Sequence, residues 1–208
     1  MKKAIVIISV AVASFLAGWI LMAPSLEYFG KYQNMNTLIS GKKMVRNGSW
    51  MTRLDLAQSN TPPLIRAYIA RIGLAANQAK EALYWNTYND NRNRLLDGSH
   101  SYNVHFKERP AIQDTGFWSL TVYNKDSYLV PNNEKRYALG DRSPITKSPD
   151  GSFNIHISSR KPDDANNWLP CPSSGVFSLT LRMYVPSEEA LKHAESISMP
   201  EISCLDCP

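Results

Sequence analysis

The chain has 208 residues, of which 43% are hydrophobic, a composition typical of a folded globular protein rather than a disordered one. Its formal net charge is +5, from 23 lysines and arginines against 18 acidic residues. The excess is mild, and no run of basic residues interleaved with aromatic ones accompanies it, so the sequence argues against nucleic acid as a partner.

The first element expected is a transmembrane helix over residues 1–24. Lys2 and Lys3 precede about twenty uncharged residues, the length that one helix needs to cross a bilayer core of roughly 30 Å. The alternative is a cleaved signal peptide, but its apolar part is shorter, about 7–15 residues, and small residues are badly placed for cleavage here. The positive-inside rule keeps both lysines in the cytoplasm. The sequence therefore predicts a single-pass inner-membrane protein with a cytoplasmic N-terminus and a periplasmic domain.

Two helices are expected between the anchor and the first strand. Residues 25–47 are amphipathic, with apolar residues at roughly helical spacing, and are expected to form a stalk helix. Thr61-Pro62-Pro63 begins a longer helix, because threonine can cap a helix and prolines are tolerated in its first turn. An apolar stripe continues to about Tyr84. We expect this long helix to pack across the sheet.

Two similar segments, residues 116–123 and 175–184, are the most informative part of the sequence. Each begins with Gly, continues with two apolar residues and Ser-Leu-Thr, and closes on Tyr. Apolar and polar residues alternate along both, as in half-buried strands. The residues expected to share the apolar faces are Trp118, Leu120 and Val122 in the first segment and Phe177, Leu179, Leu181 and Met183 in the second. The two strands are expected to form the floor of a β-sandwich.

Further short strands are expected at residues 84–88, 102–106, 128–130, 136–139 and 153–158. Short strands at this spacing favour a sandwich or jelly roll over parallel βαβ units. The fold class expected is mainly β: a jelly-roll-like antiparallel β-sandwich over residues 48–195, with one long packed helix. A short helix is expected from Pro186, and the tail at residues 196–208 is expected to be a loop.

Three blocks of residues resemble the domain of unknown function 1214 family, and together they cover roughly residues 48–195. The blocks are Arg66-Ala67 through Gly73-Leu74-Ala75-Ala76 to Glu81-Ala82-Leu83-Tyr84-Trp85; Gly116 to Tyr123 with Arg136-Tyr137 and Asp150-Gly151-Ser152; and Asn167-Trp168-Leu169-Pro170 with Phe177 to Tyr184 and Pro186. The resemblance implies a jelly-roll-type sandwich and no agreed reaction, so no catalytic residue follows from it. Long members carry a second domain upstream, where an anchor is expected here. The chain departs from the family at its end, which reads Cys204-Leu205-Asp206-Cys207.

The three cysteines, Cys171, Cys204 and Cys207, cannot all pair within one chain. The spacing of Cys204 and Cys207 is found in redox pairs and in half of a zinc site. A redox pair normally lies at the start of a helix in a thioredoxin-like unit, and no second cysteine pair completes a zinc site. We therefore expect a disulfide, either between Cys204 and Cys207 or from Cys171 to the tail.

Two histidines, His105 and His156, lie on expected strands and can face each other across a sheet. With a nearby carboxylate, such a pair can bind a metal or supply a general base. Each histidine also alternates with apolar neighbours, so the simpler interpretation places it on the polar face of its strand.

A second candidate site combines Arg136, Asn167, Trp168 and Arg182. A guanidinium group donates paired hydrogen bonds and an indole ring stacks, so this set suits an anionic or sugar ligand. The alternative is structural: a buried arginine pairs with Asp141 or Asp150, and Trp168 closes one end of the sandwich.

The function expected from these features is that of a membrane-anchored envelope domain that binds a ligand or a partner, or that has a structural role. Its expected partners are the membrane, an envelope protein, or a small anionic or carbohydrate ligand, and no cofactor is identified. The alternative is a hydrolase acting on an envelope carbohydrate, lipid or anionic ester, with a metal held by His105 and His156.

Overall fold

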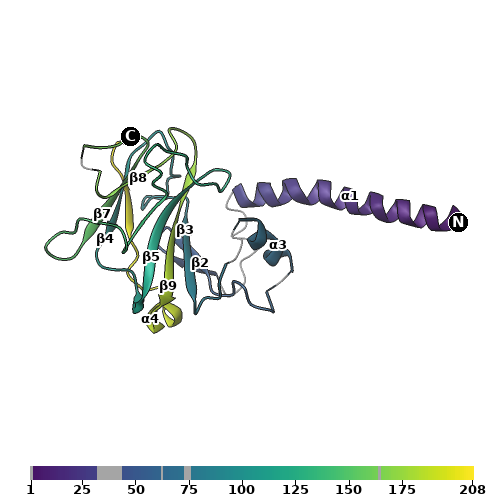
Figure 1. Cartoon of the computed structure of the whole chain (residues 1–208), viewed down its shortest axis with the longest axis horizontal. Coiled ribbons are helices and arrows are strands. Elements are labelled where there is room, and N and C mark those ends of the chain that lie inside the picture. The colour runs from purple at the N-terminus through teal and green to yellow at the C-terminus, as the bar shows by residue number, and fades with distance from the viewer. Residues whose placement is uncertain (1, 32–43, 62, 73–75, 164) are drawn as a thin grey trace. The chain divides into compact units, whose positions relative to one another are not determined.

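A computed structural model of the chain describes residues 2–31, 44–61, 63–72, 76–163 and 165–208. The chain divides into two compact units, Met1–Lys42 and Lys43–Pro208. The first unit contains helix α1 (Lys2–Lys31), and the second contains strands β1 to β10 (Figure 1).

Helix α1 carries its apolar side chains on every side: residues 6–20 are all exposed. Among the residues whose side chains are described, no helix combines the length and the apolarity needed to cross a membrane. The transmembrane helix over residues 1–24 stays a prediction. The expected stalk begins within α1, which continues to Lys31, and its middle lies outside the described residues. Its last part is not helical, because Met44–Asn47 forms strand β1.

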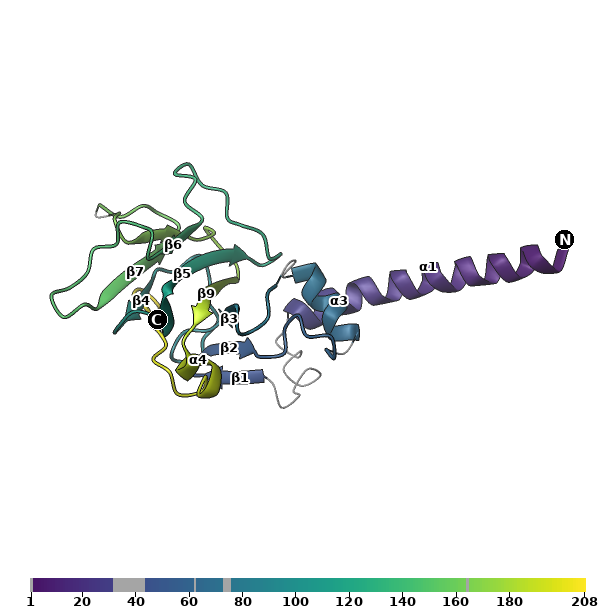
Figure 2. The same cartoon turned by 60° about the horizontal axis from the view of Figure 1, so that its bottom comes forward.

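The larger sheet has six strands in the order β1-β2-β3-β9-β5-β6, which Figure 2 shows in sequence across the sheet. Their bounds are β1 (Met44–Asn47), β2 (Trp50–Arg53), β3 (Ala82–Thr87), β9 (Phe177–Pro186), β5 (Ile112–Asn124) and β6 (Ala138–Gly140). The two similar segments of the sequence are the central pair, β5 and β9, which run antiparallel with Leu120 opposite Leu181. All seven side chains expected on their apolar faces are buried, at 3% exposure or less.

The smaller sheet has four strands in the order β10-β4-β7-β8. Their bounds are β10 (Glu201–Cys204), β4 (Tyr102–Phe106), β7 (Phe153–Ser158) and β8 (Trp168–Pro170). Strands β7 and β8 are parallel, so this sheet is mixed and not purely antiparallel as expected. Polar side chains of β4 and β7, such as Asn103 and Asn154, face outward while their neighbours in the strands are buried.

One hydrophobic core joins the two sheets into a sandwich. It contains residues from both, such as Leu120 and Leu181 from the larger sheet and Val104 and Ile155 from the smaller one. Aromatic rings cross the interface, since the centroid of Phe106 lies 5.1 Å from that of Trp118 in the opposite sheet. Burial of these faces is the main force that holds the sheets together.

The long packed helix is a wrong prediction. The helix α3 covers only Pro63–Ile72, and residues 82–84 belong to strand β3. Tyr84 pairs with Arg182 in β9, and Trp85 is fully buried. Tertiary pairing of an aromatic segment with the central strand therefore overrides a helical spacing of alanine and leucine residues.

The tail and one short strand also differ from expectation. Residues 201–204 are not a loop but strand β10, which pairs with β4, so that Ile202 lies opposite Val104. Residues 128–130 form no strand, and only an isolated bridge joins Leu129 to Tyr123. The expected short helix is α4 (Glu188–Lys192), whose N-cap is Ser187: its hydroxyl accepts a hydrogen bond from the Ala190 N–H at 3.1 Å.

Candidate ligand-binding site

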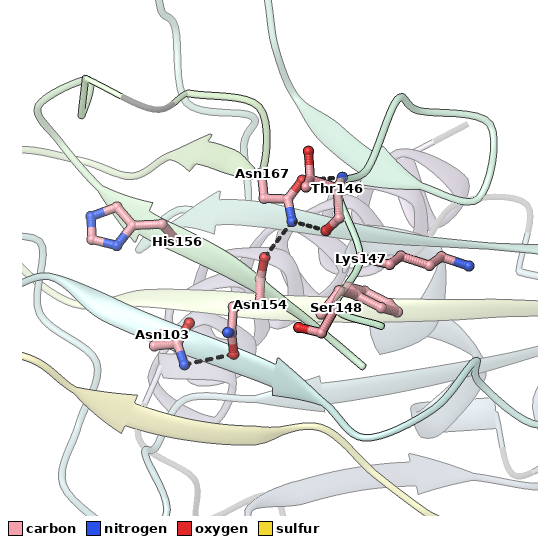
Figure 3. Close-up of a pocket in the computed structure, with 8 residues that line it drawn as sticks. Asn103, Thr146, Lys147, Ser148, Asn154, His156 and Asn167 are labelled. Carbon is pink, nitrogen blue, oxygen red and sulfur yellow. Dashed lines mark hydrogen bonds between the residues drawn. The ribbon is translucent and has the colours of Figure 1, made fainter. Parts of the chain in front are cut away.

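A pocket of about 340 Å³ lies on the outer face of the smaller sheet (Figure 3). Strands β4 and β7 supply its floor, and a loop before β7 and the residue before β8 supply its walls. The residues that line it are Asn103, Thr146, Lys147, Ser148, Phe153, Asn154, His156 and Asn167. Alternation in β4 and β7 explains the polar floor, because the apolar residues of both strands point into the core.

Asn167 builds the wall of the pocket. Its side-chain amide donates hydrogen bonds to the carbonyl oxygens of Thr146 at 2.7 Å and Asn154 at 2.9 Å. Its side-chain oxygen accepts a hydrogen bond from the Thr146 N–H at 2.8 Å. Figure 3 shows these bonds joining the loop to strand β7. Asn167 thus fixes the loop that carries Lys147, and its amide nitrogen has both hydrogens engaged.

The floor is organised around the side chain of Asn154. Its oxygen accepts a hydrogen bond from the Asn103 amide at 2.9 Å and lies 2.8 Å from Nδ1 of His105. Within the described part of the chain, the Asn154 side-chain nitrogen and the Asn103 side-chain oxygen have no protein partner. Both therefore remain available to a ligand.

The walls add a charge and two hydroxyl groups. Among described residues, no hydrogen bond or ion pair engages the side chains of Lys147, Thr146 or Ser148. The Lys147 ammonium lies 5.9 Å from the centroid of the Phe153 ring. No carboxylate is among the described residues that line the pocket, and Figure 3 shows the Lys147 side chain extending away from the asparagines of the floor, so its positive charge lies at the rim of the pocket.

His156 completes the lining from strand β7. It lies opposite Asn103 in β4 and opposite Trp168 in β8. Burial lowers the pKa of His156 below its ordinary value of 6.5, and the negative charge of Asp206 opposes that shift. The ring is therefore neutral at pH 7, and the Lys147 ammonium is the positive charge of the pocket at that pH.

Two of the other predicted ligand residues hold the loop beside the pocket. Arg136 donates from Nη1 to the carbonyl oxygens of Ala165 at 2.6 Å and Trp168 at 3.0 Å. The Trp168 side chain is 4% exposed, and its indole nitrogen donates to the carbonyl oxygen of Ser158 at 3.1 Å. Both therefore position the segment that leads into β8, and neither lines the pocket.

Arg182 lies apart from this group, on the outer face of the larger sheet. Its guanidinium donates to the hydroxyl oxygens of Thr121 at 3.0 Å and Tyr123 at 2.6 Å. The predicted set of four is therefore divided between the two outer faces of the sandwich: Arg136, Asn167 and Trp168 lie near β8, and Arg182 lies on β9.

The two predicted metal ligands lie on neighbouring strands, but not directly opposite each other. His105 is paired with Asn154, and His156 with Asn103. In the described part of the chain, neither histidine belongs to a cluster of three or more metal-ligating side chains. Metal binding by His105 and His156 stays a prediction.

The cysteines differ sharply in state. Cys204 and Cys207 form a disulfide within the tail. Cys171 is a free thiol that is 4% exposed, and burial raises its pKa to about 12.

Several pocket residues have a weak signal in the sequence. Asn103 and Asn154 each alternate with apolar residues, which marks them as outward-facing, but the pairing of β4 with β7 is not visible there. Thr146 and Lys147 precede the turn at residues 148–151, which the hydrogen bond from the Gly151 N–H to the Ser148 carbonyl closes, and they carry no motif. Only the folded loop brings them over the sheet.

Comparison with known proteins identifies a family and a fold, but no activity. No curated protein matches the chain. The crystal structure of the VPA0106 protein from Vibrio parahaemolyticus is similar, with a TM-score of 0.57 and 30% identity over 71% of this chain and 36% of that one. An uncharacterized protein from Burkholderia cenocepacia matches with a TM-score of 0.45 and 13% identity over 70% of this chain and 34% of that one. This chain thus spans about a third of the length of both structures. Residues 81–188, more than half of the chain, match the family described as "Protein of unknown function (DUF1214)", and the chain belongs to that family.

Proposed function

We propose that this protein is a binding protein of the bacterial envelope, whose sandwich takes a small, polar, negatively charged ligand into the pocket on the smaller sheet. One observation carries the proposal: the pocket combines the uncompensated Lys147 ammonium with hydrogen-bonding groups that have no partner in the described part of the chain. Such groups bind best to a ligand that accepts several hydrogen bonds and carries a negative charge.

The size and polarity of the pocket narrow the class of ligand. Its volume of about 340 Å³ lies at the lower end of the range for small-molecule sites, roughly 300–1,000 Å³. Most such sites are lined by apolar side chains, whereas seven of these eight lining residues are polar or charged. A sugar acid or another small hydroxycarboxylate fits both properties. Its carboxylate would face Lys147, and its hydroxyl groups would bond to Asn103, Asn154 and Ser148.

The N-terminal helix supports an envelope location. Residues 4–23 carry no charge, and the described apolar side chains of α1 are exposed on every side. A helix that is apolar all round is stable where it is surrounded by apolar material, such as lipid. We therefore propose that α1 lies in the inner membrane, with Lys2 and Lys3 in the cytoplasm and the domain in the periplasm.

The hydrolase alternative has no specific observation in its favour. General acid–base hydrolysis needs a titratable group positioned against the reacting atoms, usually with a second group in a complementary role. The lining residues include two titratable groups, His156 and Lys147, and no carboxylate that could act with His156. We therefore propose binding and not catalysis.

Calorimetric titration of the full chain in detergent micelles tests the proposal. The ligands are a panel of sugar acids, the neutral sugars that match them, and inorganic phosphate. We expect the sugar acids to bind and their neutral counterparts to bind at least about tenfold more weakly, because a hydrogen bond to a charged group contributes roughly 1.5–3 kcal/mol.

Variants locate the binding site in the same experiment. Lys147→Met should weaken acid binding by about tenfold or more, whereas Lys80→Met, an exposed lysine on the turn before β3, should leave it unchanged. Equal binding of acids and neutral sugars, or equal effects of the two substitutions, would contradict the proposed role of the pocket.

A further inference from the structure

A second cluster of reactive side chains lies at the C-terminal end of the chain. It shares no residue with the lining of the pocket, although the charge of Asp206 acts on His156. It consists of His100, from the loop before β4, and Cys204, Asp206 and Cys207, from the end of β10 and the residues after it. Each side chain offers one ligand atom, and all four atoms lie within 4.8 Å of one another. Cys204, Asp206 and Cys207 lie beyond the family match, which ends at residue 188, whereas His100 lies within it.

The fold holds the two halves of the cluster together. Strand β10 pairs with β4 up to Cys204, which lies opposite Tyr102. Beyond the strand, the Leu205 N–H donates to the Ser101 carbonyl at 2.9 Å, and the Ser101 N–H donates to Oδ1 of Asp206 at 2.9 Å. His100 is therefore fixed beside the tail by backbone hydrogen bonds of its immediate neighbour, whether or not the sulfur atoms are bonded to each other.

Two distances between ligand atoms of different residues, outside the disulfide itself, suit a small tetrahedral ion. Nδ1 of His100 lies 3.4 Å from Oδ1 of Asp206, and Sγ of Cys204 lies 3.7 Å from the same oxygen. Bonds of about 2.0–2.3 Å from a tetrahedral zinc ion put neighbouring ligand atoms roughly 3.3–3.8 Å apart. Two sulfurs, one imidazole nitrogen and one carboxylate oxygen form a donor set that selects zinc over calcium or magnesium.

The disulfide between Cys204 and Cys207 decides whether this donor set exists. The negatively charged thiolate is the form of cysteine that binds metals, and the sulfur atoms of a disulfide carry no negative charge. The side chains of His100 and Asp206 are 33% and 51% exposed, so a reductant and a cation can both reach the cluster.

We propose that His100, Cys204, Asp206 and Cys207 form a redox-gated zinc site, which is closed while the disulfide is present and binds Zn²⁺ once it is reduced. An external dithiol supplies two electrons and two protons, the Cys204–Cys207 bond becomes two thiols, and the dithiol closes to its own disulfide. Zn²⁺ then replaces the two thiol protons, which pass to solvent. In the reverse direction an external disulfide takes two electrons from the thiolates and two protons from solvent, the Cys204–Cys207 bond re-forms, and Zn²⁺ is released.

Cobalt(II) is the probe for the test, because it takes the place of zinc and absorbs visible light. The full chain in detergent micelles is titrated with Co²⁺ with and without prior reduction by a phosphine, which leaves no competing thiol. The reduced chain should bind one Co²⁺, with the visible bands of a tetrahedral ion and a thiolate-to-cobalt band in the near ultraviolet, and Zn²⁺ should abolish both. The oxidised chain should show neither band.

Substitutions assign the ligands. His100→Ala and Asp206→Asn, at partly exposed positions, should each weaken Co²⁺ binding by about tenfold or more, and Cys204→Ser should abolish the thiolate band. Cys171→Ser is the matched control and should change nothing, because that thiol is buried and does not belong to the cluster of four ligand residues. Absence of tetrahedral bands from the reduced chain, unchanged affinity in His100→Ala, or loss of the signal in Cys171→Ser would each overturn the proposal.

Discussion

Polar side chains around the smaller sheet have two distinct roles. Asn167 and Arg136 donate hydrogen bonds to backbone carbonyl oxygens and so fix loops. Lys147 and His156, which line the pocket, have no hydrogen bond or ion pair to their side chains among the described residues. Residue type does not separate the two roles, because one asparagine, Asn167, fixes a loop and another, Asn154, offers its side-chain nitrogen to the pocket. What separates them is whether the backbone of a neighbouring loop comes within reach.

Substitution of Arg136 tests the structural role. Arg136→Met removes the donor that serves the carbonyl oxygens of Ala165 and Trp168, so it should lower the free energy of unfolding by about 1–3 kcal/mol. Arg160→Met is the control, since Arg160 is exposed, and its effect should stay within about 0.5 kcal/mol. Urea unfolding followed by tryptophan fluorescence measures both. Equal effects would show that Arg136 does not hold the loop.

His156 gives the stability of the fold a specific pH dependence. Burial lowers the pKa of His156 from 6.5, so the unfolded chain binds this proton more tightly than the folded one. The free energy of unfolding should therefore fall as the pH falls through and below about 6.5. The carboxyl groups whose pKa is lowered, such as Asp97 and Glu201, lose their stabilising effect only below their ordinary values of 3.8 and 4.5.

The window between about pH 4.5 and 6.5 thus isolates the histidine. The thermal midpoint of His156→Asn should decline less across this window than that of the parent chain, while His193→Asn, at an exposed position, should follow the parent. A midpoint of the parent chain that rises as the pH falls from 6.5 would contradict the assignment, because it would require a raised pKa.

At the scale of elements, strand β10 is the feature that links the tail to the sandwich. Ile202 is fully buried in the core, whereas Leu205, three residues later, is 55% exposed. Ile202→Ala should therefore destabilise the protein by about 2–4 kcal/mol, and Leu205→Ala by less than about 0.5 kcal/mol. Thermal or urea unfolding measures the difference. Similar effects of the two substitutions would mean that the tail is a loop without a place in the core.

The sequence predicts the elements whose side chains alternate strongly. Strands β4 and β7 have the expected bounds, β5 contains the first expected segment, and β9 begins two residues inside the second, at Phe177. Apolar side chains at every second position can all be buried on one face of a strand, which is why these elements are predictable. Strands β8 and β10 are missed because each has only three or four residues, and the partner of β10, strand β4, lies far earlier in the sequence. The helix expected up to Tyr84 fails for a related reason: pairing with β9 decides the structure of residues 82–87.

The candidate site is less predictable than the fold. Outward-facing polar residues on β4 and β7 can be recognised from their alternation, and Asn167 belongs to the set of residues predicted from the sequence to bind an anionic or sugar ligand. The division of Arg136 and Arg182 between opposite faces depends on the order of strands in two sheets, which no local pattern encodes. The loop residues Thr146 and Lys147 become part of the site only through hydrogen bonds made by Asn167.

At the scale of the whole molecule, the proposal joins a binding domain to a membrane anchor. After cell breakage, the full chain should sediment with membranes and stay there through an alkaline carbonate wash, which strips proteins that are only attached to the surface. Removal of residues 2–23 should release the domain, because it removes the uncharged segment that is long enough to span a bilayer. Release of the full chain by carbonate would contradict the anchor.

The central claim is that the pocket on the smaller sheet binds the ligand. Side-chain amide signals of asparagine in ¹H–¹⁵N spectra test it most directly, because Asn154 lies in the pocket and Asn86 lies on the outer face of the larger sheet, where it pairs with Thr180. Titration of the full chain with a sugar acid that binds should shift the Asn154 and Asn103 amide signals. It should leave those of Asn86 and Asn132 in place. Shifts confined to Asn86, with Asn154 unmoved, would place the binding site on the opposite sheet and contradict the account.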